Sequence, residues 1–401
     1  MLLLSLIVIE GVSSILYVVL TEFGPGGTTA TLSGPSMRFD SELGWTIVPC
    51  FHETSYFAPG VPLRIDAMGF RGSHEVATNV PPGRLRILCS GDSFTFGEGV
   101  GDDQTWCRKL ESGDPRFETV NAGVSGYGVD QMYLAYLRRG LQMSYDVQLL
   151  AFIPDDLRRM QLTSLGGYEK PILRIKDDRL ESLNVPLREH SSITRWLSRK
   201  PNPLRQFRLL AMLGNLADWI VTSRSSGGIN EPTESQRAIV HKVIASLQAF
   251  NEHKKTLLVL ICLPTRAEYA YGEPSLPWRN LVAKISSEQG IPFIDLVDDF
   301  NQLPVTMRDG MFIWPESVHY FADAPGHYND QGNEYVAGMI FKKLSTIPAF
   351  SAKLRAVQTD RDRPPHSLPA LYGSKKTDIL AISLLGIAGE TSASRSVRQQ
   401  R

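Results

Sequence analysis

Three short blocks of this 401-residue sequence combine a nucleophile, free backbone donors and a base. GDSFTFG, residues 91–97, directly follows the apolar run LRILC and presents Ser93 just beyond a predicted strand. VNAGVSGYGVDQ, residues 120–131, follows a second short strand pattern, and GHYNDQGNEYVA, residues 326–337, opens the last long predicted helix. A serine hydroxyl becomes a nucleophile when a nearby histidine accepts its proton. The blocks therefore predict serine-based covalent chemistry.

The turn in the first block has a simpler alternative. GDS also fits an ordinary connection in which Asp92 or Ser93 only caps the following helix. One block is too short to decide, whereas three blocks in this order and at these spacings are much more specific. A serine beyond the carboxyl end of a buried strand also lies where open α/β sheets keep their chemistry.

The segments around the blocks alternate between strand and helix patterns. Up to residue 160, the predicted elements are strand 84–90, helix 103–112, strand 117–121, helix 129–143 and strand 146–153. After residue 232, they are helix 233–252, strand 256–263, helix 277–289 and the strand PFIDL. This alternation predicts an α/β fold built on a parallel sheet with right-handed crossovers.

Residues 160–232 interrupt the alternation, and we interpret them as an insertion near the active-site edge. They contain scattered prolines and the basic segment RWLSRKPNPLRQFR. ILRIKDDRLESL predicts a hairpin that turns at Asp177 and Asp178 and supplies a lid or a substrate wall. The basic cluster fits a solvated face better than a site for an anionic sugar or lipid headgroup.

The chain begins with an almost wholly apolar segment that has about the 20-residue length required to cross a bilayer. We interpret residues 1–20 as a single-pass membrane anchor or an uncleaved signal, with a buried soluble helix as the alternative. Glu10 lies within the segment, and no Lys or Arg precedes it, so charge leaves the orientation open. Residues 21–37 are glycine-rich and predict a linker, and residues 38–350 form the expected globular domain.

The composition excludes several classes of function. Lys plus Arg and Asp plus Glu number 42 each, so the chain has no basic field for a nucleic acid partner. It has no CxxC, HExxH or comparable cluster, and we expect neither a metal nor a cofactor. A Cys50–Cys107 disulfide is an open alternative without a spacing signature. Residues 351–401 contain the breaker RDRPPHS and a polar end, which predict a disordered tail.

With its three blocks, the chain resembles the GDSL, or SGNH, hydrolase superfamily, and in particular its bacterial members with one N-terminal membrane segment. FDSELGW, residues 39–45, and MGFRG, residues 68–72, also resemble the segments that begin the domain in that branch. The resemblance spans residues 38–345. It implies a flavodoxin-like three-layer α/β/α fold and the hydrolysis or transfer of an ester-linked acyl group.

The resemblance also implies roles for single residues. It makes Ser93 the nucleophile, places the amides of Ser93 and Gly126 in the oxyanion hole, and makes His327 the general base. In most relatives the orienting aspartate precedes the histidine by three residues. That position is Ala324 here, and Asp323 lies four residues before His327. Asp323 remains the expected orienting residue.

Alternatives stay open around the histidine. A bulge at Pro325 and Gly326 would bring Asp323 back into contact with the imidazole. Glu316 or a backbone carbonyl oxygen is the alternative group that orients the ring. His319 is the reserve candidate for the base.

The largest departure from the family follows the third predicted strand. Family members carry an asparagine there that donates to the oxyanion, whereas this chain has FIPDDLRRM. The asparagine position falls on Pro154, Asp155 or Asp156, and none of these supplies an amide donor. A protonated Asp155 or the Arg158 guanidinium is the expected substitute. We expect Asp155 to face the pocket and to pair with Arg158 or Arg159, because an unpaired carboxylate there is costly.

The sequence therefore favours a membrane-tethered serine esterase. By resemblance, its substrate is an acetyl ester on cell-envelope carbohydrate or lipid, and its catalytic domain is periplasmic or extracellular. Acyl transfer to a sugar hydroxyl through the same serine is one alternative. A carbohydrate-binding or assembly protein with a decayed site is another, which FIPDDL favours and the intact Ser93, Gly126 and His327 oppose.

Overall fold

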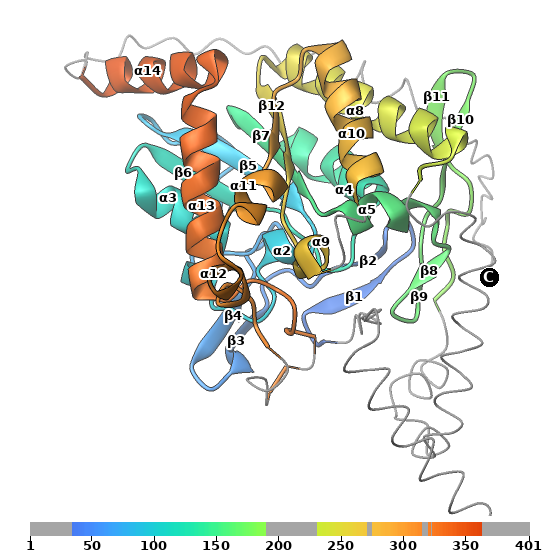
Figure 1. The fold of residues 1–401 in the computed structure, drawn as a ribbon, viewed down its shortest axis with the longest axis horizontal. Coiled ribbons are helices and arrows are strands. Elements are labelled where there is room, and N and C mark those ends of the chain that lie inside the picture. Colours follow the sequence, from blue (N-terminus) through green and yellow to red (C-terminus); the bar gives the residue numbers. More distant parts are fainter. Residues whose placement is uncertain (1–33, 190–230, 271–274, 315–319, 322, 363–401) are drawn as a thin grey trace, which may run out of the picture.

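The computed structural model describes residues 34–189, 231–270, 275–314, 320–321 and 323–362 (Figure 1). The expected anchor at residues 1–20, most of the linker, part of the insertion and most of the tail therefore lie outside the described residues. Within the described ranges, no helix combines the length and the apolar character needed to cross a membrane.

A five-stranded parallel sheet forms the centre of the domain. Its strands lie in the order β13 (Phe293–Asp295), β12 (Leu257–Cys262), β7 (Val147–Phe152), β5 (Leu85–Gly91) and β6 (Phe117–Asn121). Numbered along the chain, this is the flavodoxin-like order 2-1-3-4-5. The expected α/β fold with a parallel sheet is thus confirmed. The strand order reverses between β5 and β7, and ligands bind at the carboxyl ends of strands beside such a switch point.

The sheet residues are buried on both faces because successive side chains point to opposite sides. Leu88, Leu150 and Leu260 belong to the core on one face. Their neighbours Ile87 and Leu149 belong to the core on the other face. This explains why the strands read as continuous apolar runs in the sequence.

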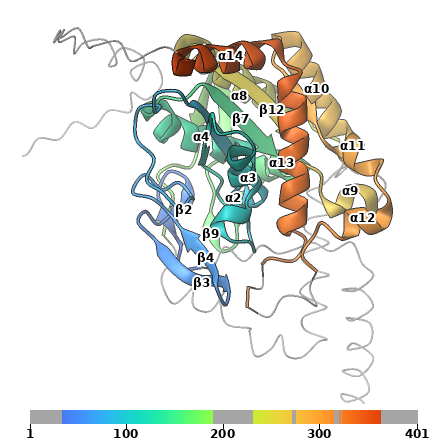
Figure 2. The same cartoon turned by 90° about the vertical axis from the view of Figure 1, so that its left-hand side faces the viewer.

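Helices cover both faces and complete three layers (Figure 1, Figure 2). One face is covered by α4 (Val129–Arg138), α8 (Glu234–Lys254) and α10 (Leu276–Gln289). The other is covered by α3 (Trp106–Gly113), α13 (Asp330–Ser345) and α14 (Pro348–Asp362). The expected three-layer arrangement is therefore present.

Short helices lie at the connections between these elements. The α-helical ones are α2 (Ser93–Phe96), α5 (Pro154–Arg158), α9 (Arg266–Ala270), α11 (Val297–Asn301) and α12 (Val305–Asp309). The 3₁₀ turns are η1 (Asp102–Gln104), η2 (Gly140–Gln142) and η3 (Arg159–Gln161). The helix expected over 129–143 accordingly ends at Arg138 and continues only as a 3₁₀ turn.

Helix α13 begins within the third block, at Asp330, and is fixed at both its cap and its buried face. The Asn329 side chain accepts a hydrogen bond from the Gly332 amide at 2.9 Å, which caps the helix. Val336, Ile340 and Leu344 follow at four-residue spacing and are fully buried. The cap and the buried face of α13 therefore fix the position of the chain immediately before this helix.

In the described part of the chain, four antiparallel hairpins lie outside the central sheet. Two precede it: β1 (Met37–Asp40) with β2 (Gly44–Ile47), and β3 (His52–Ala58) with β4 (Val61–Arg64). The β3–β4 hairpin lies at the same end of the domain as α12 (Figure 2). Two follow β7: β8 (Ser164–Leu165) with β9 (Tyr168–Glu169), and β10 (Leu173–Lys176) with β11 (Arg179–Ser182). Of these hairpins, only β10–β11 was predicted from the sequence.

The predicted turn at Asp177 and Asp178 is confirmed. Lys176 pairs with Arg179, so exactly these two residues form the loop. Their φ angles are 49° and 58°, which is the left-handed conformation that a type I′ turn needs at both positions. Aspartate tolerates this conformation better than most residues, which explains why the Asp177–Asp178 pair indicates a turn in the sequence.

The expected start of the disordered tail at residue 351 is wrong, and the open alternative of a disulfide is excluded. The chain stays ordered into helix α14 as far as Asp362, because Phe350 is fully buried and Leu354 packs against the same core. The Cys50–Cys107 disulfide is absent, since Cys50 is exposed, Cys107 is buried in the core, and both are free thiols. The residues after Asp362 lie outside the described part.

Candidate active site

Ser93 lies at the carboxyl edge of the sheet, in the turn from β5 to α2. A Cβ atom on Gly91 would lie 2.6 Å from the Ala151 carbonyl oxygen, so only glycine allows the chain to pass β7 here. The Asp92 carboxylate accepts a hydrogen bond from the Phe94 amide at 2.9 Å and so caps α2. The capping role considered for Asp92 is therefore real, and it leaves the Ser93 hydroxyl available for a separate contact.

Ser93 and His327 are far apart in the sequence, and the fold brings their side chains into contact. The distance between His327 Nε2 and Ser93 Oγ is 2.8 Å. His327 Nδ1 lies 3.2 Å from the Ala324 carbonyl oxygen, and the Asp323 carbonyl oxygen also contacts the ring. Because carbonyl oxygens only accept, Nδ1 carries the proton and Nε2 is free to accept the Ser93 hydroxyl proton. This is the tautomer that a general base requires.

Main-chain carbonyls contribute to the orientation of the imidazole. The backbone alternative considered from the sequence fits the structure, because the turn before α13 directs the Ala324 and Asp323 carbonyls at the ring. The orienting role of the Asp323 carboxylate stays a prediction, and its charge also helps to raise the pKa of Glu98. The two other candidates, Glu316 and His319, lie outside the described residues.

The environment of His327 favours its neutral form. Burial disfavours the imidazolium, and the positive charge of Arg159 acts in the same direction. The carbonyls of Ala324 and Asp323 oppose these effects only in part, and the pKa of His327 falls to about 4. At neutral pH the ring is therefore ready to accept a proton.

The second block forms a tight turn beside α2. A Cβ atom on Gly123 would lie 2.8 Å from Phe96 Cα, so the two segments pack backbone to backbone. Gly126 has a φ of 78°, the left-handed conformation that favours glycine. Among the described residues, no hydrogen bond uses the Gly126 amide, which lies in a turn and not in a helix. The convergence of the Ser93 and Gly126 amides on one point stays a prediction.

Asp155 lies at the start of α5 and forms the expected ion pair with Arg158. Its side chain is 46% exposed. Among the described residues, no hydrogen bond or ion pair links Asp155 to Ser93 or His327. The oxyanion role expected of Asp155 thus has no polar connection to the Ser93–His327 pair and stays untested.

A buried cluster that sequence reasoning missed lies directly beneath Ser93. Asp92, at the end of β5, and Asp156, just after β7, are both fully buried. Arg159 Nη1 lies 2.7 Å from Asp156 Oδ1 and 3.5 Å from Asp92 Oδ2. The Ser93 hydroxyl lies 3.4 Å from the same Asp92 oxygen. The only sequence signal was one acidic residue after each of two strands that flank the switch point.

The two carboxyls of the cluster are harder to ionise than free aspartates. Burial raises the pKa of both, and the negative charge of Asp92 and its hydrogen bond raise the pKa of Asp156 further. The positive charge of Arg159 opposes this rise at both carboxyls. Arg159 is the cation that acts electrostatically on both Asp92 and His327, so it places positive charge beside the nucleophile.

Comparisons with known proteins find similar solved structures at low sequence identity. A lipolytic protein of the G-D-S-L family from Veillonella parvula DSM 2008 is 13% identical, with 66% of this chain and 100% of that chain covered and a TM-score of 0.37. The acetyl xylan esterase AlAXEase is 13% identical, with coverages of 66% and 100% and a TM-score of 0.38. A putative lipolytic protein of the G-D-S-L family from Desulfitobacterium hafniense DCB-2 is 12% identical, with coverages of 65% and 99% and a TM-score of 0.36. No family model and no curated protein matches the sequence.

Proposed function

We propose that this chain is a serine hydrolase of ester bonds. The observation that carries the proposal is the 2.8 Å contact between Ser93 Oγ and His327 Nε2 at the carboxyl edge of a parallel sheet. Nucleophile and base within hydrogen-bond reach, with the base oriented by further acceptors, is the arrangement that covalent acyl transfer requires. A site that had lost its function would have no need to retain this geometry.

The reaction follows from the positions of the two side chains. The Ser93 oxygen attacks the ester carbonyl carbon while Nε2 of His327 takes the hydroxyl proton. The bond to the leaving alkoxide then breaks, and His327 returns the proton to that oxygen. Water then attacks the carbonyl carbon of the acyl group on Ser93 while His327 takes a proton from the water. The bond between this carbon and Ser93 Oγ breaks, His327 returns the proton to Oγ, and the acid is released.

The negative charge on the substrate oxygen needs donors, and we assign three. The Ser93 and Gly126 amides supply two, because both lie in turns after buried strands. Arg159, which lies a few residues after the position of the family's asparagine, adds positive charge that acts on the neighbouring His327. It is better suited than the Arg158 considered from the sequence, because Arg158 is held by Asp155 and Arg159 by the cluster beneath Ser93.

Replacing Arg159 tests this electrostatic role. We expect Arg159→Met to lower kcat for ester hydrolysis by about 10²–10³-fold, the loss typical of one oxyanion donor. The acid limb of the pH profile should move to higher pH, because the Arg159 charge lowers the pKa of His327. Steady-state kinetics between pH 4 and 9 measure both effects. Arg158→Met is the matched control, and a larger effect from that variant would contradict the assignment.

The Asp155 carboxylate is not part of this assignment, and its replacement is a second test. Asp155→Asn should raise turnover if the new amide reaches the oxyanion, or leave it unchanged if Arg159 already serves. The half-exposed ion pair with Arg158 contributes only about 0–1 kcal/mol to stability, so the variant should fold normally. A large fall in kcat in a folded Asp155→Asn protein would show that this carboxyl has a catalytic role.

For the substrate, we propose an acyl ester, most simply acetyl, on cell-envelope carbohydrate or lipid. Support comes from the apolar segment at residues 1–20, which would tether the domain at a membrane, and from the resemblance of the three blocks to membrane-anchored esterases. The catalytic domain would then face the periplasm or the cell exterior. No nucleic acid partner and no cofactor are part of the proposal.

The decisive experiment uses the full-length chain in detergent. Acetate release from p-nitrophenyl acetate and from acetylated envelope glycan is measured beside the Ser93→Ala variant, and acyl-enzyme is trapped by acid quench and located by mass spectrometry. We expect acylation at Ser93 and release of free acetate. Acetate that appears on an added sugar would assign transfer, and the absence of any acylated Ser93 would overturn the proposal.

A further inference from the structure

Glu98 is a buried acid that the mechanism above does not use. It follows α2 by two residues, and its side chain accepts a hydrogen bond from the Ser125 hydroxyl. Both residues are almost inaccessible, at 7% and 3% exposure. Ser125 immediately precedes Gly126, the residue whose amide is assigned to the oxyanion. Glu98 therefore contacts the turn that presents this donor.

The Ser125 turn is held from a second side. Trp45 Nε1 donates to the Ser125 carbonyl oxygen at 2.9 Å, and the Trp45 side chain is fully buried. This carbonyl belongs to the same peptide group as the Gly126 amide. With the hydroxyl bound to Glu98 and the carbonyl bound to Trp45, the plane of that peptide group is set by these two contacts.

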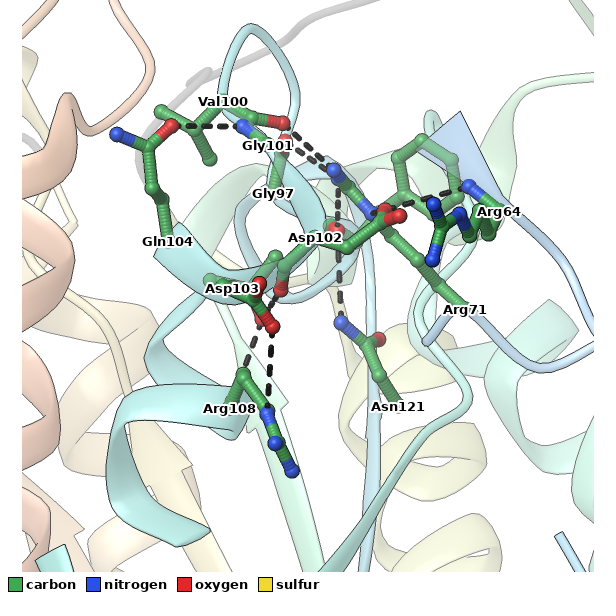
Figure 3. A network of polar contacts seen from close by, with 12 residues as sticks. Arg64, Arg71, Gly97, Val100, Gly101, Asp102, Asp103, Gln104, Arg108 and Asn121 are labelled. Atoms are coloured by element: carbon green, nitrogen blue, oxygen red, sulfur yellow. Dashed lines mark hydrogen bonds and ion pairs between the residues drawn. The ribbon is translucent and has the colours of Figure 1, made fainter. Parts of the chain in front are cut away.

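The loop that carries Glu98 is itself rigid. Arg71 donates to the Gly97 and Val100 carbonyl oxygens, each at 2.6 Å, and its Nε pairs with Asp102 at 3.0 Å (Figure 3). The Arg71 side chain is almost completely buried. Because charge-assisted hydrogen bonds reach the backbone on both sides of Glu98, the acid is held at a fixed position.

We propose that Glu98 is a positioning residue for the proposed ester hydrolysis: its protonated side chain holds Ser125 and thereby aims the Gly126 amide at the oxyanion, and its ionisation switches the site off. The inference rests on the proposed function. An ionised Glu98 would place a buried negative charge on the residue that contacts Ser125, next in sequence to the Gly126 donor. Such a charge opposes the negative charge that develops on the substrate oxygen in the transition state.

The surroundings of Glu98 place this switch at mildly alkaline pH. Burial is the main cause that raises its pKa, to about 8, and the charges of Asp323 and Asp92 act in the same direction. The Ser125 hydroxyl and the Arg71 guanidinium oppose the rise. Tyr56 also faces Glu98, and the charge of Glu98 contributes to the raised pKa of the Tyr56 hydroxyl. The acid is therefore neutral at pH 7, and activity is lost as the pH rises through about 8.

Substitution of Glu98 separates charge from hydrogen bonding. Glu98→Gln keeps the acceptor but cannot ionise, so we expect kcat at pH 7 within about threefold of wild type. It should show no fall from pH 8 to 9.5, where wild type loses about tenfold per pH unit. Glu98→Ala should lower kcat at least about tenfold with little change in KM, because it frees the turn without removing substrate contacts.

A matched control exists in the same domain. Glu268 is also buried and also accepts a hydrogen bond from a serine hydroxyl, that of Ser275. Burial raises its pKa as well. We expect Glu268→Gln to retain the alkaline fall of wild type. If Glu98→Gln also retains it, or if Glu98→Ala matches wild type in kcat, the proposal is overturned.

Hydrogen exchange tests the positioning without any substrate. We expect the peptide that contains residues 122–128 to exchange faster in Glu98→Ala than in wild type, and at the wild-type rate in Glu98→Gln at pH 7. Unchanged exchange in Glu98→Ala would reject the role of Glu98 even in an active enzyme. Conversely, an inactive wild type with accelerated exchange in the variant would reject ester hydrolysis and keep the structural inference.

Discussion

Ser93→Ala is expected to lower kcat/KM for p-nitrophenyl acetate by about 10⁴-fold or more, because the acyl-enzyme cannot form without the hydroxyl. The variant should fold normally, since the cap of α2 comes from Asp92 and not from Ser93. Initial rates with purified full-length protein, together with circular dichroism of both proteins, measure the effect.

A buried serine on β5, the strand that precedes Ser93, provides the control. Ser90 lies three residues earlier, at the end of β5, and contacts Gln148 at 3.4 Å. Ser90→Ala should change kcat/KM by no more than about threefold, because its hydroxyl has no role in the chemistry. If Ser93→Ala kept a tenth of the wild-type rate, the nucleophile would have to be sought elsewhere.

His327→Ala should cause a loss of about the same size, about 10⁴-fold or more in kcat, since nucleophile and base act as a unit. For the same reason, the Ser93→Ala/His327→Ala double variant should be no slower than either single variant. The contact that both variants remove is the 2.8 Å hydrogen bond between Ser93 Oγ and His327 Nε2.

The pH profile reports the environment of His327. Its neutral form is the base, and its pKa is lowered to about 4, so activity should fall below about pH 5 and stay constant from there up to the alkaline loss proposed for Glu98 near pH 8. An acid limb at the ordinary histidine value of about 6.5 would mean that the ring is solvated or paired with a carboxylate. A loss from Asp323→Ala as large as that from His327→Ala would also contradict orientation by carbonyls. A comparable loss from His319→Ala would favour the reserve base.

The sequence alone determined the central elements and the two reactive side chains. Apolar runs such as Leu85–Cys89 predict buried parallel strands because both faces of the sheet are covered. Asp177 and Asp178 predict their hairpin turn because the signal lies within a few adjacent residues. Ser93 and His327 were identifiable because each lies in a short block whose glycines and caps also determine the local backbone.

The termini of elements were less predictable from local patterns. Helix α14 was missed because its helical pattern is weak, and Phe350 becomes informative only once α13 and the sheet provide a core for it. Cys107 was a candidate for a disulfide because a sequence does not show that its side chain faces the same core. Tertiary packing decides such cases, since burial energy exceeds local propensity.

Only the tertiary structure decided the electrostatics of the site. Asp92 and Asp156 are far apart in the sequence, and the charge of Asp92 raises the pKa of Asp156 because β5 and β7 are neighbours at the switch point. Glu98 meets Ser125, and the carbonyls of the turn before α13 meet His327, for the same kind of reason. A pKa depends on the solvent that is excluded and the charges that are nearby. These quantities arise only when distant segments pack together, so the sequence could name the proposed nucleophile and the proposed base, and the fold had to set the pKa of that base.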